Sequence, residues 1–415
     1  MGASGSRQRD VRLIVGAVGV SALGDFLLWI PLTLYLQETT GSGLAVAALF
    51  VALWAPAVLL APVAGLLVDR TEARAVLCVA SLCQAAVAAA LALALDSVGA
   101  ILVLAALLGV GFAIAQPAEF SLVPVIGGDR ERLTQLNGWV ETARYAGMTA
   151  GPPIGGVLAG VGGTDVAMLV NSATFVAVAV AALLLRARRP PQPAAEDGEP
   201  DRARDGVVYL FRDRALGLVM SVVFVSLLFM TASATAEVFF IKEDLQVSDA
   251  LYGLLFGAWT CGMVAGAVVV SRRIPATALG LGVIVAVGVQ GAGLGLPTVW
   301  LAVGFGAAMW FIGGLGHGTK NVLARTLIQQ RVPDRLHGRA FAAYNGLRNG
   351  AELFALAGGG VLVAAIGGRA TLALAGAVPV AAAVVGLALY RRPSGPVSPV
   401  DADPAFAGGD PPPTS

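Results

Sequence analysis

Apolar runs long enough to cross a bilayer dominate this chain of 415 residues. A membrane-spanning helix needs roughly 20 predominantly apolar residues, and in lipid only helices and closed barrels satisfy all their backbone polar groups. The chain is 57% hydrophobic and 13% charged, whereas soluble domains carry about 25% charged residues. We therefore predict an all-α membrane protein with twelve transmembrane helices, near residues 12–36, 43–68, 75–95, 99–124, 135–161, 165–185, 215–240, 251–271, 275–296, 299–328, 340–366 and 370–390.

The composition excludes several other classes of protein. A formal net charge of +1 provides no basic surface for nucleic acid. Cys78, Cys83 and Cys261 form no CxxC pair, and His317 and His337 are isolated, so the sequence indicates neither a disulfide framework nor a metal site. No nucleophile–base pair and no ATP-hydrolysing motif is visible. We predict a protein that is not an enzyme, needs no cofactor and draws its energy from an ion gradient.

Basic residues are distributed unevenly among the loops between the apolar runs. With a cytoplasmic N-terminus, 21 of the 27 Lys and Arg residues fall in cytoplasmic segments, and only Lys242 and Arg369 fall in outer loops. An excess of Lys and Arg marks the cytoplasmic side of a membrane protein. We therefore predict that both termini are cytoplasmic.

A polar segment divides the chain into two similar parts. Prolines between positions 190 and 193 and acidic residues between 196 and 205 interrupt the apolar pattern, which is typical of a solvated linker. We predict an N-terminal six-helix bundle at 1–189, a cytoplasmic linker at 190–206, a C-terminal six-helix bundle at 207–392 and a disordered cytoplasmic tail at 393–415.

The two predicted bundles share short sequence repeats. Asn137-Gly138 and Asn345-Gly346 open the fifth and eleventh runs at an offset of 208 residues, and segments 44–54 and 249–259 align with a shared Trp. Transporters built from such repeats bind their substrates near the bilayer midplane, between the repeats, and rock around that site. The repeats favour a pseudosymmetric transporter.

The fifth apolar run contains an unusual Gly- and Pro-rich segment at residues 147–156. Its two adjacent prolines, Pro152 and Pro153, lack backbone donors and disfavour a straight helix, while glycines at four-residue spacing provide a flat face for close helix packing. A bent, smooth spanning helix indicates a hinge. The segment resembles the GxxxGPxxGG signature of antiporters of the major facilitator superfamily and matches it at Gly147, Gly151, Pro152, Gly155 and Gly156.

A second motif follows the second apolar run. Residues 65–74 resemble the loop signature GxLaDrxgrr of the same superfamily, although Glu72 and Ala73 depart from it. The resemblance implies that Asp69, Arg70 and Arg74 form a gating latch on the cytoplasmic side, in which the carboxylate accepts hydrogen bonds from a helix N-terminus and pairs with an arginine.

Further resemblance points to one branch of the superfamily. Three segments are similar to the macrolide-efflux and enterobactin-exporter proteins of the drug:proton antiporter branch. They are Gly24-Asp25 followed by Pro31-Leu32, residues 117–124 and residues 321–339. The resemblance implies export more strongly than proton coupling, because the fourth-helix arginine of drug antiporters has no counterpart among residues 106–115.

Ionisable residues at membrane depth are the main candidates for function, since each central Asp, Lys or Arg costs roughly 2.5–3.5 kcal/mol to insert. All of them fall in runs 1, 4, 5, 7, 10 and 11, which line or flank the cavity in the resembled fold. These residues are Asp25, Glu119, Glu141, Arg144, Glu237, Lys320, Arg325, Arg348 and Glu352.

Five of these residues are candidates for proton coupling or substrate binding. Asp25 has no cation within one helical turn, so it can exchange a proton, bind a substrate cation or belong to a hydrogen-bonded structure. Glu141 and Arg144 are three residues apart, and Arg348 and Glu352 are four apart, so each pair can form an ion pair on one helix. A proton can also exchange for the second pair.

The other ionisable residues are predicted to act in gating or to reach water. Lys320 and Arg325 lie in the inner half of the tenth run, where long side chains can snorkel towards water; we assign them to gating. Glu119 is the predicted gate partner near the inner end of the fourth run, and Glu237 lies near the outer end of the seventh.

Together these features predict a secondary transporter of a bacterial cell (inner) membrane that functions as a monomer. We expect it to export small hydrophobic or amphipathic compounds in exchange for protons, by alternating access. The alternatives are a transporter of one defined metabolite, such as a siderophore or a sugar, and a membrane sensor that does not transport.

Overall fold

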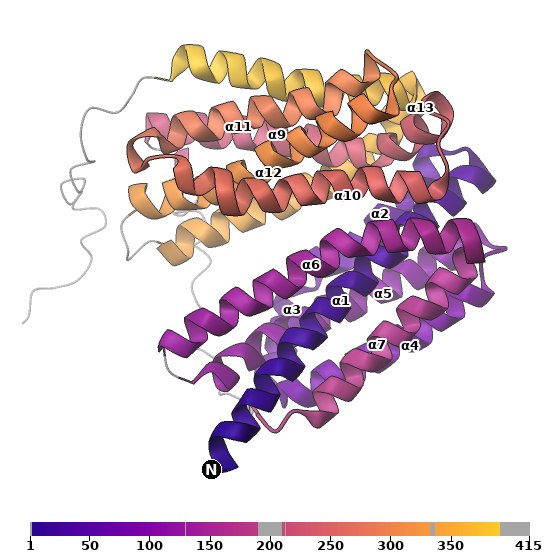
Figure 1. The fold of residues 1–415 in the computed structure, drawn as a ribbon, viewed down its shortest axis with the longest axis vertical. Helices are drawn as coiled ribbons and strands as arrows, with labels where there is room; N and C mark the ends of the chain where they lie inside the picture. The colour runs from indigo at the N-terminus through magenta and orange to yellow at the C-terminus, as the bar shows by residue number, and fades with distance from the viewer. Residues whose placement is uncertain (1, 129, 190–209, 212, 333–336, 391–415) are drawn as a thin grey trace, which may run out of the picture.

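The computed structural model describes residues 2–128, 130–189, 210–211, 213–332 and 337–390, which are helical with short connections and no strand (Figure 1). The predicted linker, 190–206, and the predicted tail, 393–415, lie outside these residues. The long helices are α1 (Gly2–Thr40), α2 (Gly43–Leu59), α3 (Ala61–Arg70), α4 (Ala73–Leu93), α5 (Val98–Gly127), α6 (Arg130–Gly162), α7 (Thr164–Leu184), α9 (Arg214–Phe239), α10 (Asp249–Ala265), α11 (Leu279–Gly295), α12 (Val303–Arg331) and α13 (His337–Leu389).

Short helical turns extend or adjoin these helices. They are the π-helices η1 (Phe240–Asp244) and η2 (Gly266–Val270) and the 3-10 helices η3 (Ser271–Arg273), η4 (Ala276–Ala278) and η5 (Leu296–Thr298). Within the described residues, eight helices are long and apolar enough to cross a membrane. The predicted all-helical, multi-pass architecture is confirmed, whereas the count of twelve spans stays a prediction.

Side-chain caps fix where several helices begin. The side chains of Ser42, Ser97 and Ser248 accept hydrogen bonds from backbone N–H groups in the first turns of α2, α5 and α10, and Asp213 accepts two at the start of α9. Because the first four N–H groups of a helix have no intrahelical partner, these side chains set the start points.

Two breaks differ from the predicted runs. The run expected at 43–68 divides at Leu60 into α2 and α3. Pro62 stands in the first turn of α3, where backbone N–H groups have no intrahelical partner, so its missing N–H costs no hydrogen bond. The runs expected at 340–366 and 370–390 join in α13, which changes direction at Gly367. Gly367 has φ +80°, a conformation that glycine adopts readily because it lacks Cβ.

The helices before and after residue 200 pack mainly within two groups, which we call the first and second halves. In the first half α1 packs on α6, α4 on α5 and α2 on α5; in the second half α9 packs on α13, α11 on α12 and α10 on α12. Each of these pairs has its counterpart in the other half. Across the halves, α6 packs on α10 and α2 on α13.

Among the described residues, the buried core joins the two halves at one end. One apolar cluster combines residues of both halves, including Leu34, Phe50, Phe240 and Trp310. Two further clusters each belong to a single half, one around Ile14 in the first half and the other in the second. Figure 1 accordingly shows α6 and α10 close together near one end and diverging towards the other.

We call these the closed end and the linker end. The closed end contains the C-terminal turns of α1, η1 and the first turn of α10, whereas the linker end contains the start of α1 and residue 189, where the described part of the first half stops. Small residues permit the closed-end contacts: a Cβ on Gly253 would strike the carbonyl oxygen of Pro152, and one on Gly360 would strike Ala47.

Candidate functional site

Three predicted membrane-depth residues meet in the first half. Asp25 of α1, Glu119 of α5 and Arg144 of α6 line one small cavity. Arg144 Nη2 donates to Glu119 Oε1 at 2.7 Å, and 7% of the Glu119 side chain is exposed. Arg144 Nε lies 3.8 Å from Glu141 Oε1, and half of the Glu141 side chain is exposed. The predicted pair with Glu141 therefore exists, but Glu119 is the closer and more deeply buried partner.

The structure thus places Glu119 in the same cluster as Asp25, although sequence reasoning assigned it to a gate. Spacing along one helix identifies Glu141 as a partner of Arg144, whereas Glu119 stands on another helix and no local signal pairs the two. Asp25 likewise has no cation near it along α1, yet the charge of Arg144 acts on it in the fold.

The cavity between these residues is small and polar. Its volume is about 10 Å³, which provides room for roughly one water molecule. Ser81 and Gln84 line it and are almost completely buried, and Arg144 Nε has no hydrogen-bond partner among the described residues. Two carboxyl groups and one guanidinium are electrically neutral only when one carboxyl group holds a proton. The cluster can therefore store a proton away from bulk water.

A second cluster lies in the second half, where α12 and α13 meet. Arg348 Nε lies 3.4 Å from Glu352 Oε1, with 37% and 33% of the two side chains exposed, so the predicted pair is present. The charges of both residues act on Lys320 of α12, and those of Lys320 and Arg348 act on His317.

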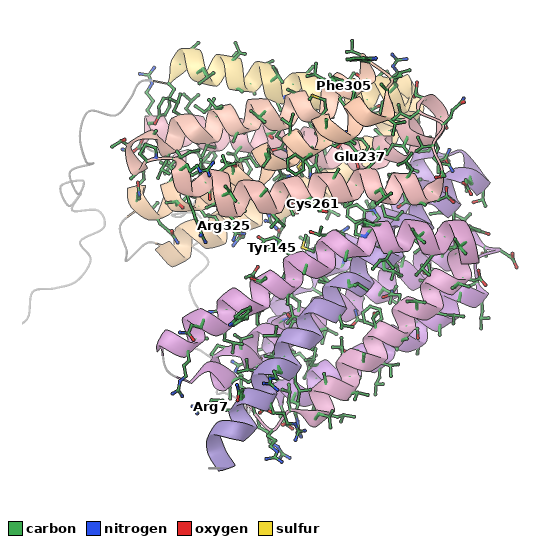
Figure 2. All side chains as sticks on the ribbon, viewed as in Figure 1. Arg7, Tyr145, Glu237, Cys261, Phe305 and Arg325 are labelled. Carbon is green, nitrogen blue, oxygen red and sulfur yellow. The ribbon has the colours of Figure 1, made fainter. Side chains whose placement is uncertain are left out.

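One premise about this cluster is wrong, although the gating role of Lys320 stays a prediction. The Lys320 side chain does not snorkel to water, since only 1% of it is exposed, because α12 packs closely on α10 and α11 through Gly314, Gly316 and Gly318. Arg325, by contrast, is exposed and lies towards the linker end, whereas Glu237 lies towards the closed end (Figure 2). Glu237 is half-buried and accepts a hydrogen bond from Ser233 at 3.1 Å.

An ion pair and a hydrogen bond join the halves at the closed end. Lys242 Nζ of η1 lies 3.0 Å from Glu38 Oε1 of α1 and 2.7 Å from Asp249 Oδ1 of α10, and Gln37 Nε2 donates to Glu243 Oε1 at 3.4 Å. Sequence reasoning missed this set of contacts. The signal that could have found it is that Lys242 is one of only two lysines in the chain.

At the linker end the predicted latch is only partly described. Arg74 Nη1 donates to the carbonyl oxygen of Leu185 at 2.8 Å, and Arg74 Nε lies 3.4 Å from Glu72 Oε1. Arg70 is exposed, and the side chain of Asp69 lies outside the described part of the structure. Arg74 thus ties α4 to the end of α7, within the first half.

The predicted hinge residues occupy two faces of α6, which continues through Pro152 and Pro153 as one helix. Gly147, Gly151 and Gly155 face α1: a Cβ on Gly151 would lie 2.7 Å from Phe26 Cβ, and one on Gly155 would lie 2.7 Å from the carbonyl oxygen of Leu27. Gly156 and both prolines instead face α10 of the other half. The segment therefore packs on its own half and on the opposite half at once.

Comparison with protein families decides what kind of protein this is. A family model described as "Major Facilitator Superfamily" matches residues 14–355 and, in a second match, residues 218–408. The chain belongs to the major facilitator superfamily. It is therefore a multi-pass membrane transporter that handles small molecules, and not an enzyme. The second match begins in the second half, as expected of a repeated fold.

Solved structures of other superfamily transporters share this fold. A bacterial homologue of the iron transporter ferroportin, in an inward-facing state, matches with a TM-score of 0.70 at 16% identity and covers 93% of this chain and 99% of its own. A mutant of the nucleoside transporter NupG matches with a TM-score of 0.69 at 14% identity, covering 91% and 100%. An auto-inhibited POT family peptide transporter matches with a TM-score of 0.69 at 13% identity, covering 93% and 99%. Identities this low establish the fold alone, and no curated protein sequence matches the chain.

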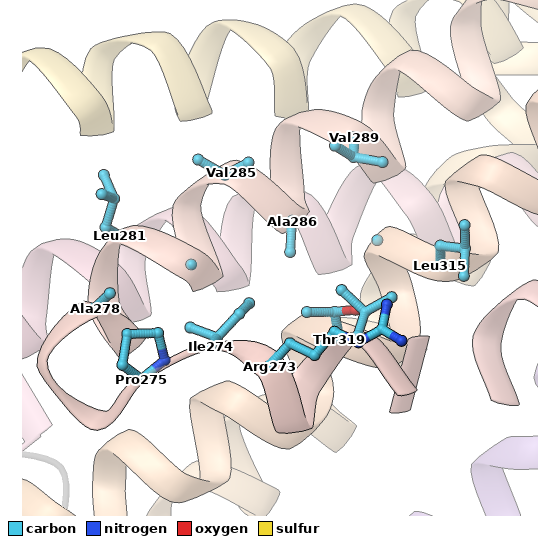
Figure 3. Close-up of a pocket in the computed structure, with 13 residues that line it drawn as sticks. Arg273, Ile274, Pro275, Ala278, Leu281, Val285, Ala286, Val289, Leu315 and Thr319 are labelled. Carbon is cyan, nitrogen blue, oxygen red and sulfur yellow. The ribbon is translucent and has the colours of Figure 1, made fainter. Parts of the chain in front are cut away.

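A larger cavity has a volume of about 470 Å³ (Figure 3). Residues of η3, α11 and α12 line it, and its lining is apolar apart from Arg273 and Thr319. None of the nine membrane-depth residues belongs to it. A site that moves charge is therefore better sought in the two clusters.

Proposed function

We propose that this superfamily member is a secondary active transporter of the drug:proton antiporter branch, which exports small hydrophobic or amphipathic compounds in exchange for protons. The observation that carries this proposal is the cluster of Asp25, Glu119 and Arg144, in which a proton balances the charge. The resemblance of residues 147–156 to the antiporter signature supports export.

The contacts between the halves support alternating access. The halves share one apolar core, an ion pair and a hydrogen bond at the closed end, and they have separate cores at the linker end. If the linker is cytoplasmic, this arrangement corresponds to an inward-facing state, the state reported for the ferroportin homologue. Transport then requires that the closed end opens while the linker end closes.

Aromatic side chains support a hydrophobic substrate. Trp29 of α1 meets Phe256 of α10 edge to face, with ring centroids 5.2 Å apart, and Phe26 lies 5.5 Å from Trp29. These rings join the two halves beside the shared core. Flat apolar molecules can stack on such rings, and aromatic pairs add about 0.5–1.5 kcal/mol beyond area burial.

The proposal includes twelve spans in two six-helix bundles, at 1–189 and 207–392. Beyond the eight helices that are long and apolar enough, α2, α6 and α12 are further candidates, and division of α13 at Gly367 gives one more. We also propose that the protein resides in a bacterial inner membrane, that both its termini are cytoplasmic and that it functions as a monomer.

A transporter of one defined metabolite is the second candidate. It is favoured by the similar solved structures, which include transporters of nucleosides and peptides and a homologue of an iron transporter. Growth inhibition by chemically diverse toxic compounds, measured with and without expression and with a protonophore, separates the two. Protection against many unrelated compounds supports efflux, whereas a narrow profile supports the defined metabolite. A non-transporting sensor would protect against none.

Proton coupling is tested in proteoliposomes that contain a pH-sensitive dye. A substrate from the growth panel should drive proton movement through the wild type, and Asp25→Asn should abolish that movement. Asp96→Asn, which alters a loop carboxylate at the closed end, is the matched control. Unchanged proton movement in the Asp25 variant would remove that residue from the coupling mechanism. The same assay with Glu352→Gln tests the second-half pair.

A further inference from the structure

The cluster around Lys320 contains more positive charge than the protein itself balances. Lys320 is almost completely buried and forms no hydrogen bond and no ion pair within the described part of the chain. Burying an unpaired ammonium group is costly, because the protein interior solvates charge poorly. A buried lysine of this kind needs a partner.

Another polar group in the same cluster is also unsatisfied. His317 Nδ1 is buried and has no hydrogen-bond partner among the described residues, whereas buried Arg348 Nε has only its ion contact with Glu352. Glu352 is the carboxylate whose charge acts on Lys320, and its Oε1 already lies 3.4 Å from Arg348.

The two halves therefore carry opposite charge at corresponding places. In the first half Asp25 and Glu119 line one cavity together with Arg144. Arg144 and Glu352 occupy equivalent positions, because 208 residues separate them just as they separate Asn137 from Asn345. Where the first half places one cation with two carboxyl groups, the second half places one carboxyl group, Glu352, with two cations, Arg348 and Lys320.

We propose that Lys320, with Arg348, binds an oxyanion of the transported molecule, a carboxylate or a phosphate on an amphipathic body. About one third of each of the Arg348 and Glu352 side chains is exposed, so this pair is accessible from the surface. The Trp259 ring lies edge-on to His317, with centroids 5.8 Å apart, and provides an apolar surface beside the charge. This inference rests on the proposed transport function and specifies the class of its substrate.

Matched probes test the inference by binding alone. Purified full-length protein in phosphatidylcholine nanodiscs is titrated with pyrenebutyrate, pyrenebutanol and pyrenebutylamine, and energy transfer from tryptophan to pyrene reports binding. A hydrogen-bonded charge pair contributes enough to favour the carboxylate over the alcohol by about tenfold or more. We expect the amine to bind no more tightly than the alcohol.

Substitutions in the cluster should change this preference in opposite directions. Lys320→Met should reduce the preference to less than about threefold and leave alcohol binding unchanged, whereas Glu352→Gln should increase it by removing the competing carboxylate. Arg272→Met removes an exposed cation of the same half that does not line the 470 Å³ cavity, and it is the control. Equal binding of all three probes to the wild type, or loss of affinity in both cluster variants, would overturn the proposal.

Two further arms distinguish a lipid site from a substrate site, and binding from transport. If phosphatidylglycerol in the nanodisc displaces pyrenebutyrate in proportion to its content, the cluster binds a lipid headgroup and the substrate assignment is wrong. Carboxylate binding that depends on Lys320, without any transport in proteoliposomes, would support the site and refute the proposed function. Proton-coupled export without a carboxylate preference would support the proposed function and refute the oxyanion site.

Discussion

Removing the Lys242 ammonium group should favour opening of the closed end. Lys242 Nζ contacts Asp249 within its own half and Glu38 in the first half. Only the contact with Glu38 breaks when the halves separate there, because Lys242 and Asp249 move together. Lys242→Met retains the length of the aliphatic chain and deletes the charge.

The structure limits the size of this effect. The Lys242–Glu38 distance is 3.0 Å, but half of the Glu38 side chain is exposed, so solvent screens the pair. Partly exposed ion pairs contribute roughly 0.5–1 kcal/mol, which corresponds to about a two- to fivefold change in an equilibrium constant. We expect the ratio of outward-open to outward-closed molecules to rise by that factor.

Spin-label distance measurements across the closed end provide the assay. In a cysteine-free background, labels at Asp96 and Val299, which stand in connections of opposite halves, report the separation of the halves. Arg369→Met is the control, because Arg369 contacts Asp244 and Thr298 within the second half. If the Lys242 variant shows the wild-type distance distribution, or if the control shifts it equally, the Lys242–Glu38 pair does not hold the closed end shut.

Three further substitutions test the packing of the first half. Gly151→Leu should destabilise the protein by about 1–3 kcal/mol through overpacking and abolish transport, whereas the control Gly138→Leu, at a position with free space around it, should be tolerated. A stable, active Gly151→Leu variant would show that the close α1–α6 contact is not needed for transport. Arg144→Met should lower the free energy of unfolding by about 3–5 kcal/mol by leaving Glu119 buried without its partner, and the double variant with Glu119→Gln should recover much of that loss. Thermal unfolding in detergent measures both variants, and a double variant no more stable than Arg144→Met would contradict the pairing. Asp10→Ala should lower the free energy of unfolding by about 1–3 kcal/mol, because Asp10 is 5% exposed and accepts hydrogen bonds from the backbone N–H groups of residues 186 and 187. An unchanged melting temperature would show that water takes over the hydrogen bonds of the Asp10 carboxylate.

The helical architecture could be predicted from the sequence because lipid imposes a simple rule on it. A run of about 20 apolar residues has to satisfy its own backbone, so length and hydropathy together specify a helix. Where a helix breaks within an apolar run depends instead on individual prolines and glycines. The division at Leu60 depends on the positions of Pro56 and Pro62 within the turns, and the change of direction at Gly367 depends on its positive φ.

The candidate site could be predicted only where its members share a helix. Arg348 and Glu352 are four residues apart, and their pair is present as predicted. The pair of Arg144 with Glu119 joins α6 to α5, and that of Lys242 with Glu38 joins the two halves. Such pairs depend on helix packing, which a single sequence does not encode in any local pattern.

Burial of Lys320 was missed for a related reason. Snorkelling requires a free path for the side chain, and hydropathy contains no information on what surrounds a helix. Glycines at 314, 316 and 318 bring α10 and α11 against α12, so the same small residues that lower the hydropathy of α12 also remove the path to water. Glycine spacing along a span is therefore a signal that a neighbouring long cation is enclosed.

The contacts between the halves suggest how an opening motion can proceed without unpacking them. The α6–α10 and α2–α13 contacts are equivalent under the repeat, since α6 corresponds to the first part of α13 and α2 corresponds to α10. Both contain glycine surfaces: Pro152 and Pro153 lie against Gly253 and Gly257, and Gly360 lies against Gly43 and Ala47, with the Val363 side chain also on Gly43. Small residues let two helices approach closely and leave few side chains to repack when the helices turn on each other. We infer that these two contacts form the pivot, and that the ion pair of Lys242 with Glu38 shifts the balance between the two states by about two- to fivefold.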